Sequence, residues 1–127
     1  MGKHTLVAVG LCCVLAGCGS GRHEGPPPTR SVFVAEANKL CATAKTRAEL
    51  VVGLRALRPP AGGEPLYARW LQAEKDAVAA TKAAADGSKA ESDPLVLLAI
   101  AEGKVTGYAR RLGAETCAKR TIGTMPP

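Results

Sequence analysis

Side chains that could catalyse a reaction or bind a metal are few in this sequence. Its 127 residues include five Cys and only two His. These residues are Cys12, Cys13, Cys18, Cys41, Cys117, His4 and His23. Nucleophilic catalysis by Ser or Cys usually needs a base such as His held against the nucleophile, and residues 31–120 contain no His. For His23, which stands beside Glu24 in a Gly- and Pro-rich stretch, a solvated side chain is a better interpretation than a metal ligand.

Other motifs of catalysis and cofactor binding are also missing from the sequence. Metal sites are built from clusters of His, Cys and carboxylates, and the spacing of these residues predicts none. The glycines form no phosphate-binding pattern. Glu74 and Asp76 stand two residues apart, so they point to different sides of a helix. We therefore expect a protein that is not an enzyme and has no cofactor and no metal site.

The first residues have the layout of an export signal. Lys3 gives the start a positive charge, and an uncharged apolar run extends from Leu6 to Ala16. A basic start, an apolar run of about 7–15 residues and a small-residue cleavage site are typical of a secretory signal peptide. The run is shorter than the roughly 20 residues that a membrane-spanning helix needs.

The stretch Leu15-Ala16-Gly17-Cys18 closes this run and resembles the lipobox of bacterial lipoproteins. In that family a signal peptidase cuts before the Cys, which carries acyl chains such as palmitate. The resemblance implies a signal peptide at residues 1–17, a lipidated Cys18 and a location on the extracytoplasmic face of the cell membrane. Two acyl chains suffice for stable anchoring. The alternative is an ordinary secretory signal cut at a small-residue site.

Residues 18–30 predict a tether between this anchor and a folded domain. Gly and Ser make its first half flexible, and Pro26-Pro27-Pro28 stiffens the second half. The tether reaches at most about 40 Å when fully extended. The folded domain would therefore stay near the membrane surface.

The chain is basic, with 17 Lys and Arg against 11 Asp and Glu. Loss of Lys3 with the signal peptide leaves 16 basic residues and a charge of about +5. A positive surface favours anionic lipids, acidic polymers or nucleic acid, but an exported protein does not meet nucleic acid routinely. This leaves the membrane, an envelope protein or another anionic surface as the expected partners.

Residues 31–120 predict an all-α domain, a small antiparallel bundle of three helices. The first helix is expected from Ser31, as its cap, to about Leu57, because Pro59-Pro60 ends it. Apolar residues recur along it at spacings of three and four, at Phe33, Ala37, Leu40, Ala44, Ala48, Val51 and Leu54. The charged residues between them, Arg47 included, fall largely on the opposite face.

The second helix is expected to begin at Glu64-Pro65 and to stop at Asp86-Gly87. The third begins at Ser88 or at Asp93, since both fit a capping pattern, and ends at Gly113. Short connections between such helices favour an antiparallel bundle. The last residues, 121–127, are expected to form a flexible tail.

Several single residues carry further expectations. Aromatic residues make up only 3% of the chain, and Trp70 is interpreted as a wedge between helices. The alternative is a ligand pocket near Trp70 and Tyr108. Gly103 and Gly107 are expected to allow close helix packing inside the bundle, and Glu102 is expected to reach solvent.

The folded part also resembles a type of small helical lipoprotein seen in high-GC actinobacteria, whose activity is unknown. The shared features lie in residues 38–118 and are Cys41, Pro59-Pro60, Trp70-Leu71, Asp86-Gly87, Leu112-Gly113 and Cys117. Export places thiols where they oxidise. After cleavage, Cys41 and Cys117 are the only Cys besides Cys18, so we expect a disulfide between them. Two buried free thiols are the alternative.

These features predict a membrane-anchored envelope lipoprotein that acts as a non-catalytic interaction module. The alternative is a helical carrier that binds a small ligand at the membrane surface. A tightly packed Ala-rich bundle leaves little room for such a ligand, which favours the first interpretation.

Overall fold

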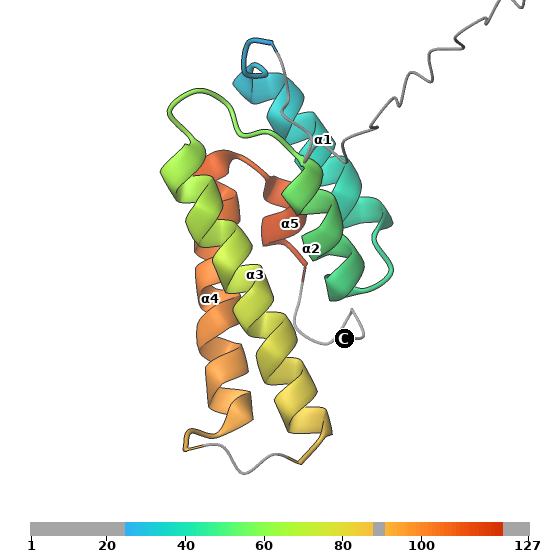
Figure 1. Ribbon diagram of the computed structural model, residues 1–127, viewed down its shortest axis with the longest axis vertical. Helices are drawn as coiled ribbons and strands as arrows, with labels where there is room; N and C mark the ends of the chain where they lie inside the picture. The colour runs from blue at the N-terminus through green and yellow to red at the C-terminus, as the bar shows by residue number, and fades with distance from the viewer. Residues whose placement is uncertain (1–24, 88–90, 121–127) are drawn as a thin grey trace, which may run out of the picture.

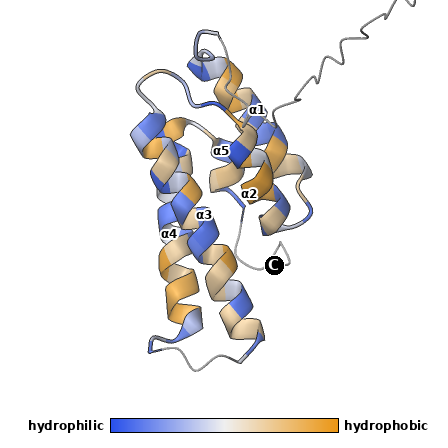
Figure 2. Cartoon of the chain, in the orientation of Figure 1, coloured by the Kyte–Doolittle hydropathy of each residue, from blue (hydrophilic) through white to orange (hydrophobic). Residues whose placement is uncertain are grey.

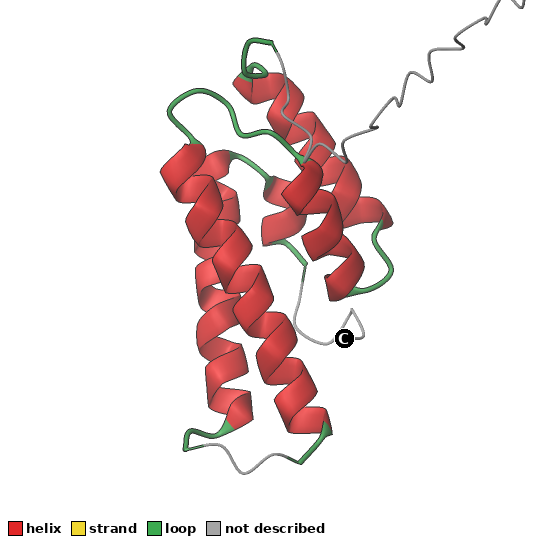
Figure 3. Cartoon of the chain, viewed as in Figure 1, coloured by secondary structure: helices red, strands yellow, loops and turns green. Residues whose placement is uncertain are grey.

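The computed structural model describes residues 25–87 and 91–120, and this part of the chain is all-α. The helices are α1 (Arg30–Thr43), α2 (Arg47–Ala56), α3 (Glu64–Ala85), α4 (Pro94–Leu112) and α5 (Glu115–Ala118). The two long helices, α3 and α4, form an antiparallel hairpin and make the most extensive contact of the fold (Figure 1). The shorter helices α1 and α2 pack beside one half of this hairpin, and α5 lies between α4 and α1 (Figure 3).

The prediction of a single helix over residues 31–57 is wrong. The helix is interrupted at Ala44–Thr46, which separates α1 from α2. The Thr46 hydroxyl accepts a hydrogen bond from the Glu49 amide at 3.1 Å. The Glu49 carboxylate in turn accepts from the Lys45 amide at 2.8 Å. This reciprocal arrangement resembles a capping box and stabilises a new helix start. The helix α2 can therefore fold back along α1.

The two helices approach closely at Gly53. A Cβ atom on Gly53 would lie 2.8 Å from Cδ2 of Leu40, which is closer than real Cβ contacts. The small residue thus lets α2 pack against α1.

The start of α1 also differs from the expectation. Thr29, and not Ser31, is the N-cap, since its hydroxyl accepts from the Val32 amide at 3.4 Å. The next residue, Arg30, donates from its guanidinium to the Arg111 carbonyl at 3.0 Å. This contact ties the start of α1 to the end of α4.

The limits of α3 and α4 agree with the sequence signals. The helix α3 begins at Glu64 and ends before Gly87, whose φ of 64° is left-handed. The helix α4 begins at Pro94 with Asp93 as its cap, while Ser88 lies outside the described residues. It ends at Gly113, whose left-handed φ of 89° turns the chain back toward α1. Glycine adopts this conformation without steric cost.

The described residues do not form the expected three-helix bundle. The α1–α2 pair covers only one half of the hairpin, so the other half extends beyond it as a two-helix arm (Figure 1). The expected close packing at Gly103 and Gly107 is wrong, because a Cβ atom at either position would meet nothing within 4 Å. Both glycines are exposed on α4.

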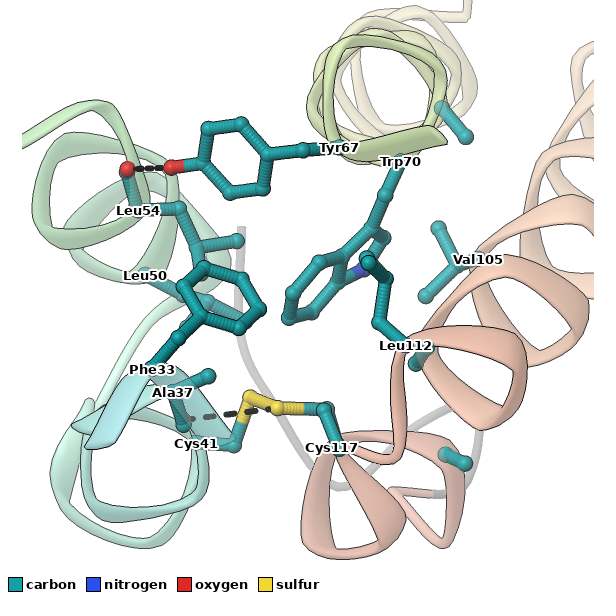
Figure 4. Close-up of a cluster of buried hydrophobic side chains, with 14 residues drawn as sticks. Phe33, Ala37, Cys41, Leu50, Leu54, Tyr67, Trp70, Val105, Leu112 and Cys117 are labelled. Atoms are coloured by element: carbon teal, nitrogen blue, oxygen red, sulfur yellow. Dashed lines mark hydrogen bonds between the residues drawn. A yellow bond between two sulfur atoms is a disulfide. The ribbon is translucent and has the colours of Figure 1, made fainter. Parts of the chain in front are cut away.

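The core lies where α1, α2, α3 and α5 meet the C-terminal half of α4 (Figure 4). Trp70 and Phe33 are completely buried, and Tyr67 makes edge-on contacts with both rings at centroid distances of 6.2 and 5.5 Å. The Tyr67 hydroxyl donates to the Leu54 carbonyl, which stabilises the end of α2. Burial raises the pKa of Tyr67 to about 12.

Cys41 and Cys117 are brought together in this core, as expected. Their sulfur atoms are 2.04 Å apart and their Cα atoms 5.2 Å apart, which makes a disulfide across 76 residues. Because α1 ends just after Cys41, the short α5 needs only the turn at Gly113 to reach it. The Thr116 amide adds a hydrogen bond to the Asn38 side chain at 3.0 Å.

We expect the disulfide to carry much of the stability. Replacing both Cys41 and Cys117 with Ser should lower the free energy of unfolding by up to about 4 kcal/mol, because the bridge closes a long loop in the unfolded chain. Urea denaturation of the oxidised chain and the double variant measures the difference. Reductant should destabilise the first and leave the second unchanged. An equal stability of the two proteins would contradict the prediction.

Candidate functional site

The largest group of charged side chains in the interior joins three helices. Arg47 at the start of α2 donates from Nη1 to Oε2 of Glu74 on α3 at 2.9 Å. Its Nη2 donates to Oε1 of Glu102 on α4. The two carboxylate side chains are only 2% and 6% exposed, and the Arg47 side chain is 11% exposed. One guanidinium therefore bridges both arms of the hairpin to α2.

Neighbouring groups complete this network. The Trp70 Nε1 donates to Oε1 of Glu74 at 3.2 Å, one helical turn away on α3. From the end of α5, Arg120 donates to the Ala44 carbonyl at 2.7 Å, which satisfies the backbone at the end of α1. Its other guanidinium nitrogen, Nη1, is buried without a partner.

Burial controls the electrostatics of the network. Desolvation raises the pKa of Glu74 and that of Glu102, and the charge of Arg47 opposes both rises. Burial therefore outweighs the attraction of Arg47 at both carboxylates. Desolvation also lowers the pKa of Arg120, although the negative charge of Glu74 acts to raise it.

The network has little room for a substrate. The void among its side chains has a volume of about 10 Å³ and is lined by Arg47, Leu50, Glu74, Glu102, Val105, Cys117 and Arg120. This is near the smallest space that holds one water molecule. The group fastens three helices together and is tightly packed.

Sequence reasoning missed this network. The expectation that Glu102 reaches solvent is wrong, and so is the placement of Arg47 on the polar face of one long helix. Arg47 stands at the start of α2 and donates to Glu74 on α3 and to Glu102 on α4. One signal for a buried Glu74 is present in the sequence. Glu74 stands one helical turn after Trp70 and between Ala73 and Ala77, which belong to the apolar face of this helix.

The predicted site residues have different outcomes. Cys18 lies outside the described residues, so lipidation stays a prediction, while Cys41 and Cys117 are joined. Trp70 is fully buried against Glu74, and the half-buried Tyr108 packs on the core. Neither residue lines the void around Arg47 or the grooves beside α1 and α4, and a ligand pocket near them stays a prediction.

The largest hollow is instead an open groove of about 560 Å³ beside α1 and the end of α2. Its lining includes Pro26 and Pro28, the last part of the predicted tether, and Val32, Leu40 and Leu57. The Pro26 carbonyl accepts from Arg58 at 3.1 Å, which holds this segment at the groove.

An exposed apolar surface lies on the first half of α4, away from the core (Figure 2). Leu95, Val96, Leu97 and Ile100 are each between 42% and 64% exposed. Beside Leu97 and Ile100 runs a shallow groove of about 370 Å³ floored by Ala79, Ala80 and Ala83 of α3. Clusters of large exposed apolar side chains often mark interaction sites, whereas single ones are common on any protein surface.

Residues 25–87 and 91–120 hold no group of three or more His, Cys, Asp or Glu side chains placed to bind a metal ion. Among these described residues, no helix is long and apolar enough to cross a membrane. In comparisons with protein-family models, curated proteins and solved structures, nothing matches the chain.

Loss of Arg47 should destabilise the fold strongly. The Arg47→Met variant would leave two buried carboxylates without their cation, at a cost on the order of 3–5 kcal/mol in the free energy of unfolding. Urea denaturation compares it with Arg55→Met, an exposed position on the same helix. Replacing Glu74 and Glu102 with Met as well should recover most of the loss. A cost no larger than that of Arg55→Met would contradict the structural role.

The raised pKa values predict an unusual pH dependence. The folded state takes up protons on Glu74 and Glu102 above the ordinary pKa of 4.5, where the unfolded state has released them. The contribution of these groups to stability should therefore increase as the pH falls from their raised pKa values toward about 4.5. In urea unfolding, the free energy of unfolding of Glu102→Gln should increase less than that of wild type as the pH falls. Glu36→Gln, at an exposed position on α1, is the control for the loss of one charge. Identical pH profiles of wild type and Glu102→Gln would contradict this prediction.

Proposed function

We propose that this protein is a lipid-anchored lipoprotein of the cell envelope that acts as a non-catalytic interaction module. The anchor rests on the lipobox-like stretch Leu15-Ala16-Gly17-Cys18, which lies outside the described residues. The anchor would hold the domain on the extracytoplasmic face of the membrane, within reach of a tether of about 40 Å or less.

The observation that carries the interaction role is the exposed apolar surface of α4. It lies on a helix that packs against α3 along the hairpin, so its backbone is ordered before any partner binds. A preorganised surface loses little conformational entropy on binding. The ionisable side chains of the interior are engaged in holding helices, which supports a binding role over a catalytic one.

A small-ligand carrier is the second candidate, and one observation favours it. The groove beside α1 has a volume in the range of ligand sites, about 300–1,000 Å³. Glu36, Lys39 and Arg58 give it a charged rim. It is open along its length, whereas ligand sites usually enclose most of their ligand, so we rank this candidate second.

The anchor is tested by removing its Cys. Replacing Cys18 with Ala should move the protein from the membrane fraction to the soluble or secreted one, because no acyl chains would be attached. Cys12→Ala, within the signal peptide, is the matched control and should leave the protein on the membrane. Mass analysis of the wild-type N-terminal peptide should show the acyl chains. A Cys18→Ala variant as membrane-bound as wild type, with no acyl mass on wild type, would contradict the proposal.

The interaction role is tested in intact membranes with a photo-crosslinking residue placed at Ile100. It should give a defined adduct there and none at Val52, which is exposed on α2. Equal adducts at both positions would show that α4 is not a preferred binding surface. A ligand carrier would instead protect the groove beside α1, which a probe at Val32 reports.

A further inference from the structure

The outer face of α4 carries a regular stripe of exposed residues. Its members are spaced alternately by four and three, as on the contact face of a coiled coil. They are Asp93, Leu97, Ile100, Lys104, Gly107 and Arg111, and each is exposed. We name these six residues the α4 stripe. The rest of α4 turns Ala101, Val105 and Leu112 toward the core, whereas Leu97 and Ile100 are large apolar side chains of the same helix that stay exposed.

The α4 stripe combines projections and hollows on the same surface. Leu97 and Ile100 project beside the groove floored by the Ala residues of α3. A surface that holds both ridge and hollow can be complementary to a copy of itself, which a two-fold interface requires.

The charges of the α4 stripe are also self-complementary. Its beginning is acidic at Asp93, and its end is basic at Arg111. Two copies of α4 packed antiparallel would place the acidic end of each against the basic end of the other. Antiparallel packing also opposes the two helix dipoles favourably.

We propose that the α4 stripe binds a second copy of this chain in an antiparallel, two-fold dimer. The inference deepens the proposed interaction role by naming its partner, and it does not require the lipid anchor. A membrane surface is a poorer occupant, because Asp86, Glu91 and Asp93 flank the exposed Leu95 and Val96. Anionic lipids would repel these carboxylates.

A cysteine near the two-fold axis tests the dimer in intact cells. Gly103 lies beside the middle of the α4 stripe, is exposed and has no neighbour within 4 Å of an added Cβ. In the full chain, Gly103→Cys should form an intermolecular disulfide and run at twice the monomer mass on a non-reducing gel. Val52→Cys, exposed on α2, should stay monomeric. No dimer, or equal dimer at both positions, would overturn the proposal.

Second substitutions on the Gly103→Cys background test the contacts. Ile100→Glu should lower the crosslinked fraction about tenfold or more, because it buries an unpaired charge in the dimer. Arg111→Glu should lower it as well, because it places a carboxylate against Asp93 of the other copy. Val52→Glu is the control and should leave the fraction unchanged. Thermal unfolding must show that each variant stays folded, so that loss of crosslinking reports the interface.

The outcomes separate this inference from the proposed function. Crosslinks that persist in Cys18→Ala would support the dimer and show that it needs no anchor. Anchored protein without the crosslink would overturn the dimer alone. An adduct of another mass at Gly103→Cys would overturn the second copy as partner while the interaction role stands.

Discussion

The guanidinium of Arg47 is the interaction on which the arrangement of the helices depends. It joins α2 to both arms of the hairpin through Glu74 and Glu102. The hairpin interior is rich in Ala, whose burial contributes less than that of larger side chains. A polar bridge is costly to bury but strongly directional, so it fixes how α2 crosses the hairpin. The disulfide between Cys41 and Cys117 then holds α1 against α5 at the same level of the hairpin.

Because both connections lie at one level, the hairpin has a covered half and a free half. In the covered half the large side chains, Trp70, Phe33 and Leu54, are completely buried. In the free half the contact between α3 and α4 is made mainly by small side chains such as Ala77, Ala80 and Ala101. The large residues Leu97 and Ile100 turn outward there. Some of the large apolar side chains of α4 therefore lie outside the core.

The sequence predicted the helical class and the limits of α3 and α4, since Pro65, Pro94 and Gly113 act locally on the backbone. It failed at Ala44–Thr46, because the apolar spacing continues through the break and each new helix keeps its phase. Only the local pattern of Thr46 and Glu49 marks the new start. The buried carboxylates were missed for another reason. Arg47 lies 27 residues from Glu74 and 55 from Glu102, and no local rule pairs residues so far apart.

The same reasoning explains where a function can lie. The residues that looked most suited to a pocket, Trp70 above all, are used to fill the space between helices. Residues 25–87 and 91–120 hold no cluster of His, Cys, Asp or Glu placed to bind a metal ion, and Arg47, Glu74 and Glu102 are engaged with one another. On the surface, α4 presents four large apolar side chains, whereas α1 and α2 present one each, Val32 and Val52. Exposed apolar clusters promote non-specific association unless a partner shields them from water, so this face of α4 is better suited to binding than the filled interior is.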